Sequence, residues 1–83
     1  MNEKKLLEKV RQSPNNVRSD DFVKLIESFG FAFARQKGSH RIFERANVPE
    51  LVNIQNVKGK AKAYQVWQFL EKVERFNLTQ EQK

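Results

Sequence analysis

The sequence predicts an α+β domain in which helices cover one face of a small antiparallel β-sheet. Apolar residues recur with helical spacing towards both ends of the chain, whereas between about residues 31 and 57 they follow the shorter period of β-strands. The length of 83 residues suits a single domain. Packing helices and a sheet in two layers buries the apolar surface of both, so this is the architecture we expect.

Two helices are expected before the sheet. The first covers residues 3–11, with Leu6, Leu7 and Val10 on one side, and it ends before Pro14. The second begins at Ser19, a favoured N-cap residue, and ends at Gly30, where a left-handed C-terminal cap is favoured. Its apolar stripe has i, i+3, i+4, i+7 spacing and consists of Phe22, Leu25, Ile26 and Phe29.

Three strands are expected next. The first runs from about residue 31 to a hairpin turn at Lys37-Gly38, because Phe and Ala alternate there. The second covers residues 39–45, and the third covers residues 51–57 after a loop that contains Pro49. The face of this sheet that the helices leave open would be available to solvent or a ligand.

The last helix is expected from Lys60 to Phe76, and Asn77 can cap its end. Its expected buried stripe consists of Ala63, Val66, Trp67, Leu70 and Val73, widened by Tyr64, Phe69 and Phe76.

Positive charge is concentrated in the middle of the chain. The formal net charge is +6, and residues 35–62 alone hold seven basic and two acidic side chains. A focused positive field attracts polyanions such as nucleic acid. The alternative is a solvated face that keeps the protein soluble.

The composition excludes several other classes. Without cysteine, a disulfide scaffold, a thiol nucleophile and a cysteine-based zinc site are excluded, and one histidine cannot form a multi-histidine metal cage. No apolar run approaches the ~20 residues of a membrane span, and residues 1–9 alternate charge with Leu, unlike a signal peptide. We therefore expect a cytoplasmic protein without a membrane partner and without a cofactor.

The segment around His40 has the residue types that phosphodiester cleavage requires. Histidine titrates near neutrality and can give or take a proton. Gly38 lets a backbone approach a phosphate closely, and Ser39 can donate a hydrogen bond. The cations that could stabilise charge on phosphate oxygens are Arg35, Lys37 and Arg41. A histidine beside a turn can equally be structural, and residue types alone leave both interpretations open.

A second basic cluster consists of Lys58, Lys60 and Lys62, at the expected start of the last helix. A helix N-terminus favours anions, and lysines add to that effect. The spacing resembles the lysine cluster with which double-stranded-RNA-binding domains contact phosphates. Lysine-rich helix starts are also common in solvated turns.

Three segments resemble the HicA-type toxins, which are small ribonucleases (mRNA interferases) of toxin–antitoxin systems. These segments are residues 29–31, Phe-Gly-Phe; residues 36–43, Gln-Lys-Gly-Ser-His-Arg-Ile-Phe; and residues 57–60, Val-Lys-Gly-Lys, followed by the closing helix. The resemblance extends from about Ser19 to Leu78.

The resemblance implies a fold like a double-stranded-RNA-binding domain, in which a helix, a three-stranded antiparallel sheet and a second helix follow in order. It implies that His40 is the catalytic residue, that mRNA is the substrate and that a HicB-type antitoxin is the partner. In this interpretation residues 1–83 form a single domain, with residues 19–78 as the HicA-like core and residues 1–16 as a helical extension.

The chain departs from the family pattern in two respects. The N-terminal helix lies outside that pattern, and packing beside the second helix is the expected arrangement. Many family members carry another histidine around the third strand, where this chain has Ile54, Gln55 and Asn56. A pair of histidines within one protomer is therefore impossible. This leaves three alternatives: the activity is full without such a pair, it needs a second protomer, or it uses a lysine as the partner of His40.

Three functions agree with these observations. The leading hypothesis is a metal-independent endoribonuclease in which His40 acts as base or acid and the neighbouring cations bind RNA. The second is a non-catalytic RNA-binding module of the same fold. The third is a domain that docks an acidic protein through its basic sheet.

Overall fold

The computed structural model describes residues 2–80, which form three helices and a four-stranded antiparallel sheet. The helices are α1 (Glu3–Gln12), α2 (Ser19–Ser28) and α3 (Ala63–Arg75). The strands are β1 (Ala32–Lys37), β2 (His40–Glu44), β3 (Val52–Val57) and β4 (Lys60–Ala61). The predicted α+β class is confirmed, and the arrangement is consistent with a fold like a double-stranded-RNA-binding domain.

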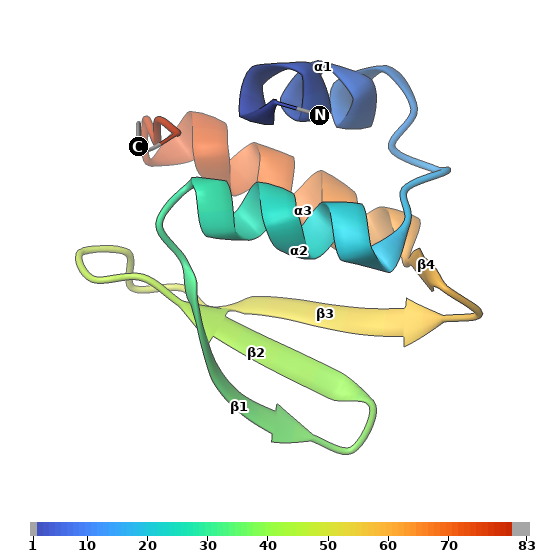
Figure 1. Cartoon of the computed structure of the whole chain (residues 1–83). Coiled ribbons are helices and arrows are strands. Elements are labelled where there is room, and N and C mark those ends of the chain that lie inside the picture. Colours follow the sequence, from blue (N-terminus) through green and yellow to red (C-terminus); the bar gives the residue numbers. More distant parts are fainter. Residues whose placement is uncertain (1, 81–83) are drawn as a thin grey trace.

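The elements lie in three layers (Figure 1). Helices α2 and α3 cover one face of the sheet, and α1 lies on the outer side of these two helices. The other face of the sheet is left open by the part of the chain that the structure describes (Figure 1). A ligand can therefore reach the strands without displacing a helix.

The strands follow the spatial order β1-β2-β3-β4, and the segment between α1 and α2 covers the β4 edge. The Ala61 N–H donates to the Val17 carbonyl at 2.9 Å, and the Ser19 N–H donates to the Gly59 carbonyl at 3.0 Å. Arg18 forms an isolated antiparallel bridge with Lys60. These bonds satisfy backbone groups that an open edge strand would expose.

Phe69 of α3 lies at the centre of the core and is 0% exposed. Its ring packs edge-on against three other phenylalanines, with centroid separations of 5.6–5.8 Å: Phe22, Phe29 and Phe31. Such pairs contribute about 0.5–1.5 kcal/mol each beyond the area that they bury. This cluster joins α2, the start of β1 and α3, and so fixes the helical layer on the sheet.

Helix α2 buries its predicted apolar stripe and ends at Ser28. Gly30 follows the C-cap residue Phe29, and its φ of 87° confirms the predicted left-handed conformation there. The prediction that Ser19 is the N-cap is wrong, because Arg18 occupies that position without a side-chain cap bond. Ser19 is buried, and its hydroxyl donates to Asn56 Oδ1 at 3.1 Å. A contact 37 residues away in the sequence thus replaces a local cap.

Helix α3 differs from the prediction at its start. It begins at Ala63 and not at Lys60, because Lys60 and Ala61 pair with β3 as the short strand β4. The reversal is a two-residue turn in which Lys58 and Gly59 have φ values of 54° and 86°, as type I′ hairpin turns require.

The predicted buried stripe of α3 is also wrong in part. Val66, Phe69 and Val73 face the core, whereas Trp67 is 55% exposed and Tyr64 is 53% exposed. Trp67 follows Val66 by one residue, which places it about 100° around the helix from the core-facing position.

Helix α1 packs on α2, which confirms the expected arrangement. Leu6 and Val10 are buried against the core, and the Asn2 side chain caps the helix by accepting from the Lys5 N–H at 2.9 Å. Helix α1 therefore extends the core on the side away from the open sheet face.

Candidate active site

The strand register separates the covered face of the sheet from the open face. Directly paired residues share a face, and Phe43 and Val52 are a buried pair that marks the covered one. His40 pairs with Gln55 on the alternate positions of the same strands, so both lie on the open face. From β1 to β4 this face carries Arg35, Lys37, His40, Ile42, Glu44, Asn53, Gln55, Val57 and Lys60.

His40 is the first residue of β2 and directly follows the hairpin turn, so it stands at the end of the open face. Its side chain is partly exposed. The Nδ1 atom lies 2.9 Å from Oδ1 of Asn53 on β3. The ring is thus held by one side chain while the rest of it remains accessible to a ligand.

The turn before His40 consists of Gly38 and Ser39, both exposed. It lies one residue later than the predicted Lys37-Gly38 turn, because Lys37 pairs with His40 as the last residue of β1. Gly38 has a φ of 61°, and a Cβ added there would have no heavy atom within 4 Å. The Gln36 side-chain amide donates to the Gly38 carbonyl at 3.0 Å and braces the turn. The open space beside Gly38 allows a ligand to approach the backbone closely.

The structure brings together some of the basic side chains predicted around His40. Lys37 pairs directly with His40, and Arg35 pairs with Ile42, so both cations share the open face with the imidazole. Arg41 pairs with Ile54 and lies on the covered side of β2. Arg41 is therefore directed away from the face that carries His40.

The three lysines of the second cluster lie on different parts of the fold. Lys58 is in the β3–β4 turn, Lys60 is on β4, and Lys62 is the N-cap residue of α3. Lys60 Nζ donates to Asn16 Oδ1 at 2.7 Å, and Lys62 Nζ lies 5.9 Å from the centre of the Tyr64 ring. Only Lys60 is placed on the open face by the strand register.

Two residues of the open face were missed by sequence reasoning. Arg18 reaches this face because it bridges with Lys60, although it belongs to the segment before α2. Asn53 does so because it alternates with the buried residues of β3. The alternation in β3 was a usable signal for Asn53, whereas no local pattern predicts the bridge of Arg18.

A family model matches the part of the chain that builds this face and the helices behind it. The model is described as the HicA toxin of bacterial toxin-antitoxin, and it matches residues 19–74, from the start of α2 to the last turn of α3. The chain belongs to the HicA toxin family. No curated protein and no solved structure gives a significant match to it.

Family membership makes this chain the toxin of a toxin–antitoxin system and implies a HicB antitoxin as its partner. The matched region contains His40, the turn before it and all four strands, whereas α1 lies outside it. Within this HicA toxin, Gln55 of β3 is the residue directly opposite His40. A glutamine amide does not titrate, so it cannot exchange protons as a second histidine would.

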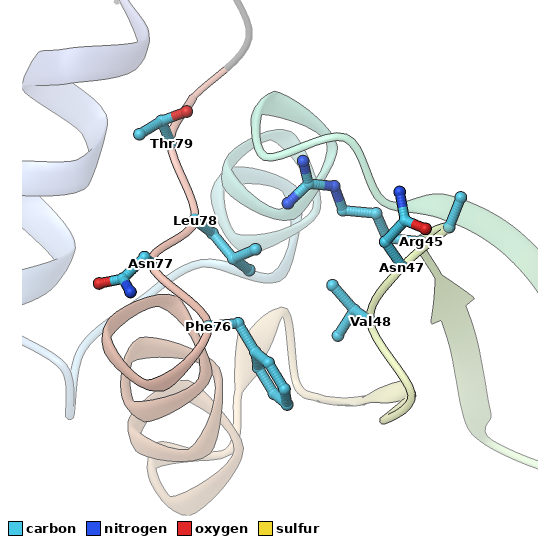
Figure 2. Close-up of a pocket in the computed structure, with 8 residues that line it drawn as sticks. Arg45, Asn47, Val48, Phe76, Asn77, Leu78 and Thr79 are labelled. Carbon is cyan, nitrogen blue, oxygen red and sulfur yellow. The ribbon is translucent and has the colours of Figure 1, made fainter.

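A separate pocket of about 220 Å³ lies at the other end of β2 and does not include His40. It is formed by the loop after β2 and the segment after α3, with Val48 on one side and Phe76 and Leu78 on the other (Figure 2). Arg45, the remaining cation of the basic stretch before Lys58, lines this pocket. The distance along β2 separates it from the candidate active site.

Two further observations concern residues 2–80 of this HicA toxin. No group of three or more His, Cys, Asp or Glu side chains in this range could hold a metal ion. None of the helices in the same range is both long enough and apolar enough to span a membrane.

Proposed function

We propose that this HicA toxin is an endoribonuclease that cleaves mRNA without a metal ion and uses His40 to transfer the proton. The observation that carries the proposal is the position of His40: it is partly exposed, beside an open glycine turn, on a sheet face that no described helix covers. Imidazole is suited to general acid–base catalysis because it exchanges protons near neutral pH.

The cations of the open face supply the charge that the reaction needs. Lys37 on β1 lies across from His40 on β2, and Arg35 lies two residues before Lys37 on β1. At these positions both can stabilise the negative charge that develops on the phosphorus oxygens. Ser39 and the backbone of Gly38 are available to donate hydrogen bonds to the same group.

Two more cations extend the basic surface towards the β4 edge. Lys60 and Arg18 are bridge partners on the open face, and Val57 separates them from the His40 row. Phosphate contacts dominate the affinity of proteins for nucleic acids, so these side chains are suited to hold the RNA backbone. Lys58, in the exposed turn beside them, can add to this contact.

The reaction products identify the nucleophile. Attack by the RNA 2′-hydroxyl leaves a 2′,3′-cyclic phosphate and a 5′-hydroxyl, whereas attack by water leaves a linear phosphate. Chromatography of the fragments from a short labelled RNA separates these two results.

The test is incubation of the pure toxin with labelled single-stranded RNA in EDTA. Fragments are expected, because the proposed groups are side chains of the protein and require no metal. Binding of RNA without cleavage would show that the protein is a non-catalytic RNA-binding module and not an enzyme. Absence of both cleavage and retention would favour a domain that docks only an acidic protein.

A further inference from the structure

Asn53 provides the side-chain hydrogen bond of His40 within the described residues. The 2.9 Å contact joins His40 Nδ1 on β2 to Asn53 Oδ1 on β3. The register pairs Ile42, and not His40, with Asn53, so the two residues are diagonal neighbours on the open face. Diagonal neighbours across antiparallel strands are within reach of long or aromatic side chains.

The chemistry of this contact determines which ring nitrogen carries the hydrogen. A carboxamide oxygen only accepts hydrogen bonds, so the Nδ1–H of His40 must be the donor. In the neutral imidazole the lone pair is then on Nε2. When the ring is protonated, Nδ1–H continues to donate to Asn53 and Nε2–H becomes available as an acid.

We infer that Asn53 is a positioning residue that keeps His40 in the Nδ1–H tautomer and directs Nε2 towards the RNA. This inference rests on the function proposed above and assigns the base role to neutral His40. Two other neighbours of His40 cannot accept a hydrogen bond from Nδ1–H. Lys37 from β1 only donates, and Ile42 is apolar. Gln55 lies directly opposite, but the contact at Nδ1 is made by Asn53.

The step that Asn53 supports is the attack of the RNA 2′-hydroxyl on phosphorus. Nε2 of neutral His40 takes the proton of the RNA 2′-hydroxyl while the 2′-oxygen forms its bond to phosphorus. The bond from phosphorus to the 5′-oxygen breaks, and the leaving oxygen takes a proton from solvent. The cyclic phosphate keeps its single negative charge, and His40 returns its proton to solvent.

The first experiment measures the tautomer directly and requires no RNA. His40 is the only histidine, so long-range ¹H–¹⁵N spectra of the imidazole carry one unambiguous set of signals. In alkaline buffer, at about pH 9 and well above the ordinary pKa of histidine, we expect the Nδ1–H tautomer in the toxin. In Asn53→Ala, His40 should change to the Nε2–H tautomer. In Asn53→Asp, which keeps an acceptor oxygen, His40 should retain the Nδ1–H tautomer. An Nε2–H tautomer in the unsubstituted toxin would overturn the inference.

The second experiment measures cleavage by the same proteins at saturating RNA. Asn53→Ala should lower kcat by about 10- to 100-fold, less than the 10²–10⁴ that general acid–base catalysis contributes in full. Asn53→Asp should recover most of that loss. Gln68→Ala, at an exposed amide on α3, is the matched control and should cleave like the unsubstituted toxin.

The two experiments separate failure of this inference from failure of the proposed function. If Asn53→Ala changes the tautomer but not kcat, Asn53 does not position a catalytic group. If the unsubstituted toxin does not cleave RNA, the proposed function fails, and with it the catalytic role inferred for Asn53.

Discussion

Gln65 replaces a missing strand partner where β4 ends, and its removal should destabilise the fold. Strand β4 stops at Ala61 and the chain enters α3 at Lys62, so the Gln55 N–H has no partner on β4. The Gln65 side-chain oxygen accepts from that N–H at 2.8 Å. Gln65 is only 3% exposed, so water cannot readily take its place.

The substitution Gln65→Leu keeps a side chain of similar size and removes the acceptor. An unpaired, desolvated N–H costs about 1–3 kcal/mol. A domain of this size loses about 4–8 °C of Tm for each kcal/mol, so the midpoint should fall by roughly 5–20 °C. The loss should be accompanied by faster hydrogen exchange of the Gln55 amide, because that amide loses its acceptor.

Thermal unfolding and amide exchange measured by NMR test both parts of this prediction. The matched control is Gln68→Leu on the same helix, where the glutamine is exposed and the change should stay within about 0.5 kcal/mol. Equal midpoints for the two variants, with slow exchange retained at Gln55, would show that the Gln65 oxygen does not stabilise the fold through the Gln55 N–H.

Three further predictions concern the core, the RNA contact and the antitoxin. Phe69→Ala should cost about 3–5 kcal/mol in urea unfolding and Trp67→Ala clearly less, because Trp67 is 55% exposed; the reverse order would mean that α3 is rotated. Lys37→Ala should lower the slope of log K against log salt for binding of single-stranded RNA by about 0.7. The control is Lys24→Ala at an exposed position on α2, which should leave the slope unchanged. An unchanged slope for Lys37→Ala would exclude a phosphate contact. The HicB antitoxin should bring carboxylates to the basic face and slow hydrogen exchange in residues 36–41, and unaltered exchange there would indicate inhibition from another surface.

Local patterns predicted most of the elements of this fold. The stripe of α2 and the cap at Gly30 depend on neighbours within one or two helical turns, and the hairpin before His40 depends on a single glycine. Each of these signals is contained in a short segment, so each could be read without knowing the rest of the fold.

The predictions that failed depend on contacts between distant segments. Ser19 is a good cap residue, but its hydroxyl meets Asn56 from β3. The pairing of Lys60 with Val57 and Arg18 draws the expected first turn of the last helix into the sheet. The orientation of α3, which leaves Trp67 outside, is decided by which of its apolar faces fits the sheet.

The candidate active site could be predicted only in part for the same reason. His40 and the two cations before the turn, Arg35 and Lys37, belong to one contiguous motif, so the sequence alone indicated them. Asn53 is brought to the imidazole by the β2–β3 register, and Arg41 is turned to the covered side by strand alternation. Both facts require the paired strands and not the motif alone.

The His40→Ala variant decides whether His40 transfers the proton in RNA cleavage. Cleavage and thermal unfolding should be measured on the same preparation. We expect cleavage to fall by about 10²–10⁴-fold, with stability within about 0.5 kcal/mol because the side chain is partly exposed. A stable variant that cleaves RNA at the full rate would show that His40 does not transfer the proton.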